Sequence, residues 1–176
     1  MYYKIPTQIP LCSPTEGDTE YIKYGLGEGE DFEGIKYTDF NVPEEAVAHF
    51  WNLIPENRRS EFEISLMTIN RDILPHTDSD SKTAINWYLK TGAYVTSFCQ
   101  AKEGSESFQL FTQTDGVIYM FEDVEMEKSF TAEDNDLYVL DVTKLHCVHS
   151  GEGHRIAMNL STNIPYDEVL ELLNVS

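Results

Sequence analysis

From residue 60 onward, apolar and polar side chains alternate with a period of two, and turn residues interrupt the alternation every few positions. Phe62, Ile64 and Leu66 alternate with acidic or hydroxyl side chains, which is the pattern of a strand with one buried face. Further strand candidates are Thr83–Leu89, Tyr94–Gln100, Phe108–Thr112, Val117–Phe121, Lys128–Thr131, Leu137–Leu140, Lys144–His149 and Arg155–Ser161. Short strands at this spacing are typical of a sandwich or barrel, so we expect a mostly β fold with a jelly-roll core.

Two segments carry helical spacing instead. The segment beginning at Asn41 has a capping residue, then Pro43 and two acidic residues, and apolar residues follow at helical spacing up to Ile54. Residues 167–175 predict a second helix, and residues 1–40 predict short edge strands and loops. No linker, repeat or low-complexity stretch divides the 176 residues, so we expect a single domain over residues 1–176.

Charge and cysteine content restrict the functional class. The formal net charge of −19 argues against a nucleic-acid partner, because phosphate binding needs clustered Lys and Arg. The acidic clusters at residues 28–33 and 122–127 fit either plain solubility or attraction of a cationic substrate. The sequence contains no run long enough to span a membrane, no secretory signal, and no CxxC pair among Cys12, Cys99 and Cys147. These features predict a cytoplasmic protein and leave its oligomeric state open.

A histidine and a carboxylate lie two residues apart in Leu74-Pro75-His76-Thr77-Asp78. On an extended segment, residues i and i+2 point to the same face, so His76 and Asp78 can both reach one metal ion. By itself this pair also fits a loop histidine beside a turn aspartate. A third candidate ligand is therefore needed.

The segment from Leu145 to Leu160 supplies further candidates. If residues 150–153 form a hairpin loop, His149 lies opposite His154 and His146 shares a face with Arg155. This register favours His146 as the third ligand and leaves His149 and His154 facing solvent or each other.

Arg155 opens an otherwise apolar strand, where burial of an unpaired guanidinium is costly. It either binds a ligand carboxylate bidentately or forms a salt bridge with a distant acid. Two histidines and one carboxylate leave three octahedral positions open on a metal, as in non-haem Fe(II) oxygenases, although Zn and Mn accept the same ligands. A carboxylate-binding arginine favours iron together with a 2-oxo acid.

In these residues the chain resembles the 2-oxoglutarate/Fe(II)-dependent oxygenases, a superfamily built on a double-stranded β-helix (jelly-roll) core. The resemblance covers about residues 62–162 and implies that His76, Asp78 and His146 bind iron. It also implies that Arg155 holds the remote carboxylate of 2-oxoglutarate, with O₂ as the other substrate. Many members carry a Tyr on the strand before the HxD motif, whereas residues 66–69 here read Leu-Met-Thr-Ile.

Asn86 and Tyr88 follow the HxD motif on the next predicted strand, and the resemblance makes them candidates for further contacts to 2-oxoglutarate or substrate. Because they share a face with Ala84, an ordinary strand role fits equally well.

Three functional hypotheses follow. The first is a 2-oxoglutarate-dependent Fe(II) dioxygenase that hydroxylates a peptide side chain or small metabolite and releases succinate and CO₂. The second is a cupin-like metal-binding jelly roll that does not use 2-oxoglutarate. The third is a jelly-roll interaction module without catalytic activity or metal.

Overall fold

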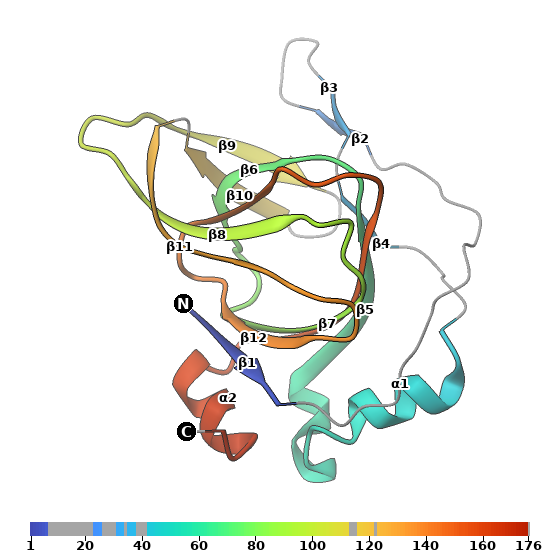
Figure 1. The fold of residues 1–176 in the computed structure, drawn as a ribbon. Coiled ribbons are helices and arrows are strands. Elements are labelled where there is room, and N and C mark those ends of the chain that lie inside the picture. Colours follow the sequence, from blue (N-terminus) through green and yellow to red (C-terminus); the bar gives the residue numbers. More distant parts are fainter. Residues whose placement is uncertain are drawn as a thin grey trace.

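The computed structural model describes residues 1–6, 23–25, 31–33, 35–37, 42–112, 116–121 and 123–175. Cys12, Asn41 and parts of both acidic clusters, residues 28–30 and 122, lie outside these ranges. Two large sheets face each other, and the helices lie outside one of them (Figure 1).

Both large sheets are antiparallel. The first sheet has the order β1 (Tyr2–Ile5), β12 (Leu137–Asp141), β7 (Thr83–Lys90), β14 (Arg155–Thr162), β5 (Phe62–Ile69) and β4 (Ile35–Tyr37). The second sheet has the order β11 (Val124–Thr131), β8 (Val95–Ala101), β13 (His146–His149), β6 (Ile73–Thr77), β10 (Gly116–Phe121) and β9 (Ser107–Thr112). A separate pair consists of β2 (Lys23–Gly25) and β3 (Asp31–Glu33).

The order of the strands defines a jelly roll. Along the chain, β5, β6, β7 and β8 alternate between the first and second sheet, and β11, β12, β13 and β14 then alternate between the second and the first. The hairpin of β9 and β10 is inserted between these two sets of four. Eight strands divided in this way between two sheets form the two Greek keys of a jelly roll. The predicted mostly β, jelly-roll architecture is therefore confirmed.

Both predicted helices are present. Helix α1 spans Glu44–Trp51 and is followed by a 3₁₀ helix, η1, at Glu56–Glu61; α2 spans Tyr166–Leu172. Pro43, rather than the predicted Asn, occupies the N-cap of α1. No helix in the described ranges is long and apolar enough to cross a membrane.

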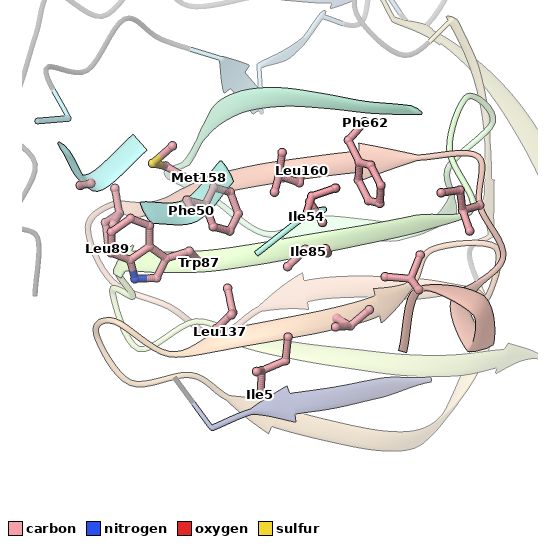
Figure 2. Close-up of a cluster of buried hydrophobic side chains, with 14 of the residues drawn as sticks. Ile5, Phe50, Ile54, Phe62, Ile85, Trp87, Leu89, Leu137, Met158 and Leu160 are labelled. Atoms are coloured by element: carbon pink, nitrogen blue, oxygen red, sulfur yellow. The ribbon is translucent and has the colours of Figure 1, made fainter. Parts of the chain in front are cut away.

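The first sheet is buried on both faces, so consecutive residues of β7 pack alternately against the helices and against the second sheet. Ile85, Trp87 and Leu89 face the helices, where the rings of Trp87 and Phe50 lie 5.8 Å apart (Figure 2). Each large side chain buried in this way contributes about 1.5–3 kcal/mol. The intervening residues face the second sheet, so the inner face of the barrel is formed by one set of alternate residues and the helix-facing core by the other.

The predicted C-terminal hairpin is wrong. β13 belongs to the second sheet between β8 and β6, whereas β14 belongs to the first sheet between β5 and β7, so His149 does not pair with His154. Residues 150–154 cross from one sheet to the other. Both edges of β13 and of β14 are hydrogen-bonded to other strands. The residues of the local turn do not specify these long-range pairings, which depend on the tertiary structure.

Gly92 fixes this crossing segment. Its carbonyl oxygen accepts a hydrogen bond from the backbone N–H of Glu152 at 2.8 Å, and its φ is +55°. A Cβ at this position would lie 2.7 Å from the carbonyl oxygen of Glu152 and 2.9 Å from that of His154. Glycine alone accommodates both the positive φ and the close backbone approach.

We expect Gly92→Ala to lower the free energy of unfolding by about 2–3 kcal/mol, because strain and a backbone clash add together. Gly104→Ala is the matched control: its φ is +82°, but no atom lies within 4 Å of the added Cβ. The control is expected to lose only about 1–2 kcal/mol. Urea unfolding of both variants measures the difference, and equal losses would contradict the role assigned to the close contact.

Candidate metal centre

The two strands that carry the histidines are neighbours in the second sheet. His76 lies near the end of β6, Asp78 follows that strand directly, and His146 is the first residue of β13. His76 and His146 are direct cross-strand partners, with ring centroids 4.4 Å apart. Antiparallel pairing therefore places the two imidazoles side by side on the inner face, although 69 positions separate them in the sequence.

The three side chains converge on one point. The Nε2 atoms of His76 and His146 lie 3.6 and 3.9 Å from Oδ1 of Asp78. All three donor atoms lie within 4.8 Å of one another, and the described residues contain no other group of three or more such donors. Adjacent ligands of an ion with bonds of about 2.1 Å lie about 3 Å apart, so each of the two histidine–Asp78 pairs needs a shift of less than about 1 Å to reach that spacing.

Backbone carbonyls set the tautomer of both histidines. Nδ1 of His76 donates to the carbonyl oxygen of Leu74 at 2.7 Å, and Nδ1 of His146 donates to that of Lys144 at 2.9 Å. A carbonyl can only accept, so each Nδ1 carries a proton, and in the neutral imidazole Nε2 then presents a lone pair toward Asp78. This outer hydrogen bond is the one that orients histidine ligands in metal sites.

Burial shifts the pKa values of two of the three candidate ligands. Burial, and then the neighbouring His76, lower the pKa of His146 to about 3, so its imidazole is neutral near pH 7. Desolvation raises the pKa of Asp78, against the opposing effect of His76. The positive charge of a bound divalent ion would offset the free-energy cost of burying the Asp78 carboxylate in its charged form. The donor set and the neutral imidazole of His146 therefore fit a divalent metal.

Arg155 is almost completely buried, with 1% of its surface exposed. It donates to Oγ1 of Thr96 at 2.9 Å and to the carbonyl oxygen of Tyr94. Its guanidinium carbon lies 5.1 and 5.6 Å from the ring centroids of Tyr88 and Tyr94. Its Nε has no hydrogen-bond partner, and no acid in the described part of the chain forms an ion pair with it. Burial accordingly lowers the pKa of Arg155.

Asn86 and Tyr88 lie on the inner face of β7, as their parity with Ala84 predicts. Three further residues, Tyr94, Thr96 and Asn159, lie beside this set and were not predicted from the sequence. Asn159 donates through Nδ2 to Oδ1 of Asn86 at 2.7 Å. The sequence carried a signal for Asn159, because it shares the strand parity of Arg155. Thr96 on β8 and Tyr94, immediately before that strand, are brought to Arg155 only by the packing of the facing sheet.

His149 lies apart from this centre. Its Nε2 lies 2.7 Å from Oγ of Ser97 and its Nδ1 lies 2.9 Å from Oγ of Ser150. Both ring nitrogens are therefore engaged by hydroxyl groups. Because successive side chains of β13 point to opposite faces of the sheet, His149 also points away from the face that carries His146.

No family model matches the sequence, and the curated proteins contain no match. Solved structures with a similar fold include the vicilin from Solanum melongena, with a TM-score of 0.39 and 13% identity over 68% of this chain and 36% of that one. Another is a mutant of the Bacillus subtilis oxalate decarboxylase OxdC, with a TM-score of 0.35 and 10% identity over 85% and 34%. The chain spans about a third of the length of each protein. At these values the likeness adds nothing to the strand order, which by itself defines the jelly roll.

Proposed function

We propose that the protein is a metal-dependent jelly-roll enzyme in which His76, Asp78 and His146 hold one divalent ion. The observation that carries this proposal is the convergence of two Nε2 atoms and a carboxylate, with each Nδ1 already hydrogen-bonded to a carbonyl oxygen. Such a set occupies one face of an ion and leaves positions open for other ligands.

For the reaction, we propose an Fe(II)- and 2-oxoglutarate-dependent dioxygenase that hydroxylates a peptide side chain or small metabolite and releases succinate and CO₂. The support is Arg155, a buried guanidinium that lacks an acidic partner in the described residues. A ligand carboxylate would supply the missing charge and accept from the fork. Bound iron and 2-oxoglutarate would supply the oxidation of a C–H bond by O₂.

The remaining tasks fall to residues of this chain. The carbonyls of Leu74 and Lys144 orient the two imidazoles, and Arg155 would fix the remote end of the acidic ligand. The rings of Tyr88 and Tyr94 flank the guanidinium and exclude water from it, which strengthens its attraction for an anion. Together these residues would hold the ligand in one orientation beside the ion.

A second candidate is a cupin-like metal-binding protein that uses no 2-oxo acid. The observation that favours it is that Arg155 already donates to Thr96 and Tyr94 and contacts two rings, so its guanidinium is partly satisfied as a structural group. This candidate keeps the metal site and assigns Arg155 to packing. A jelly roll without metal is the third possibility that the experiment below distinguishes.

The experiment is an anaerobic titration with Fe(II), with and without 2-oxoglutarate, followed in the visible range. We expect a weak metal-to-ligand charge-transfer band only when both are present, because the keto acid must chelate iron held by the protein. Fe(II) binding without the band supports the cupin-like candidate. A folded protein that binds no divalent metal would contradict both metal-dependent proposals and leave an interaction module.

Other aspects of the function stay predictions. The chain is proposed to be one cytoplasmic domain that acts on a small-molecule or peptide substrate and not on nucleic acid. The large negative charge agrees with a preference for cationic substrates, as well as with plain solubility.

A further inference from the structure

A cavity of about 670 Å³ lies where the start of β5 and the end of β14 meet α2 and the segment that joins β6 to β7. Volumes of about 300–1,000 Å³ are typical of sites for small molecules. The joining segment contributes Asp80 and Ser81 to the lining, and Asp78 begins the same segment. The cavity therefore adjoins the segment that carries one of the proposed metal ligands.

Hydrogen bonds within the protein fix the walls of this cavity. The backbone N–H of Lys82 donates to the carbonyl oxygen of Thr162 at 2.9 Å, which holds the segment between β6 and β7 against the end of β14. Oγ1 of Thr162 donates to the carbonyl oxygen of Glu61 at 2.7 Å and accepts from the backbone N–H of Ile164 at 3.2 Å. The cavity is therefore formed before any ligand binds, which lowers the entropic cost of binding.

Carboxylates dominate the charge around the cavity. In the described ranges the lining contains four acids, Glu61, Glu63, Asp80 and Glu168, and no Lys or Arg. Arg58 lies beside the cavity and shows how these groups hold a cation: it donates to both carboxylate oxygens of Glu61, and its Nη2 lies 3.0 Å from Oε1 of Glu168. Glu63 and Asp80 form no ion pair with any residue that the structure describes. Within this part of the chain, two carboxylates of the cavity therefore lack a counter-charge.

Hydroxyl and apolar groups share the remaining lining. Ser161 is the cross-strand partner of Glu63, so a hydroxyl and a carboxylate lie next to each other. Phe62 and Ile164, each 7% exposed, add apolar surface. An ammonium has three N–H donors and no acceptor, and an alkyl chain packs against apolar groups. The lining therefore favours an alkylammonium ligand, whereas a phosphate or carboxylate would face like charges.

We propose that this cavity binds a linear polyamine, with its ammonium groups at Glu63 and Asp80 and its alkyl chain against the apolar part of the lining. Glu63 and Asp80 belong to different walls, β5 and the segment between β6 and β7, so one ligand needs two cationic groups to reach both. The polyamine site is separate from the metal centre. It depends neither on the identity of the metal nor on the use of 2-oxoglutarate.

The test is a calorimetric titration of the full chain with spermidine. We expect one saturable site per chain, whose affinity falls as salt is added because both carboxylates are exposed. The double variant Glu63→Gln with Asp80→Asn keeps the side-chain shapes and removes both charges. It is expected to weaken spermidine binding by about fivefold to twentyfold, the combined effect of two exposed ion pairs. Nα-acetyl-lysine amide, which has one ammonium, should bind more weakly than spermidine.

The matched control is Glu103→Gln with Glu125→Gln, which removes two charges from exposed residues outside the cavity. It measures the general attraction of a chain with a net charge of −19, and the spermidine affinity should stay within about twofold of the wild-type value. Equal losses in the two double variants, or the absence of saturable binding, would overturn the proposal. Each single variant, Glu63→Gln or Asp80→Asn, provides the measurement if the double variant does not fold.

Binding of spermidine at the metal centre gives a different result. In that case one equivalent of Mn(II) displaces spermidine, and the separate polyamine site is excluded. With two separate sites, spermidine still saturates the Mn(II)-loaded protein. A protein that binds spermidine but no Mn(II) would contradict the metal-dependent function and support the polyamine site.

Discussion

Arg155→Met is expected to weaken 2-oxoglutarate binding by about a hundredfold or more, while the free energy of unfolding changes by no more than about 2 kcal/mol. The loss reflects two charge-assisted hydrogen bonds from the guanidinium fork to a carboxylate. The stability is nearly kept because two effects oppose each other. Methionine relieves the burial of an unpaired charge, and it leaves the carbonyl oxygen of Tyr94 without this donor.

Calorimetric titration of the metal-loaded protein measures the affinity, and urea unfolding measures the stability. Arg155→Lys is the matched control: it keeps the positive charge but loses the planar fork, so an intermediate affinity is expected. A variant that binds 2-oxoglutarate as tightly as the wild type, or one that loses several kcal/mol of stability, would identify Arg155 as a packing residue.

His146→Ala is expected to lower the affinity for Mn(II) or Fe(II) by about a hundredfold or more. The estimate follows from dividing the binding free energy of a structural metal site among its ligands, about 3 kcal/mol for each. The physical reason is that Nε2 of His146 is one of three converging donors, and the described residues contain no other group of three or more such donors.

The matched control is His149→Ala, three residues along the same strand. Both ring nitrogens of His149 already lie within hydrogen-bond distance of serine hydroxyls, so its removal should leave metal affinity unchanged. Metal content after equilibrium dialysis distinguishes the two variants. Equal losses, or a loss confined to His149→Ala, would exclude the proposed ligand set.

Much of the fold was predictable because local patterns report burial directly. The period-two alternation from Phe62 onward located seven of the eight strands of the jelly roll; β6, which carries His76, was not among the predicted strands. Pro43 and the acidic residues after it located the start of α1. Parity along β7 placed Asn86 and Tyr88 on the face shared with Ala84.

The relation between His146 and Arg155 was predicted for the wrong reason. A hairpin between β13 and β14 would place both side chains on one face of one sheet, whereas the two strands belong to facing sheets and both side chains point into the space between them. Local turn residues around Gly151 are compatible with either arrangement. Which strands pair depends on the strand edges that distant parts of the chain leave available, and the residues that determine this are spread over the whole chain.

The sequence by itself determined the residue types of the candidate site and the face of the strand on which each one lies, because alternation depends only on neighbouring residues. Tertiary structure alone decided that His76 and His146 are cross-strand partners, that Tyr94 and Thr96 accept from Arg155, and that the guanidinium has no acid beside it. These contacts join residues tens of positions apart. They exist only once the two sheets close over one another, since packing brings together side chains whose separation in the sequence carries no signal of their proximity.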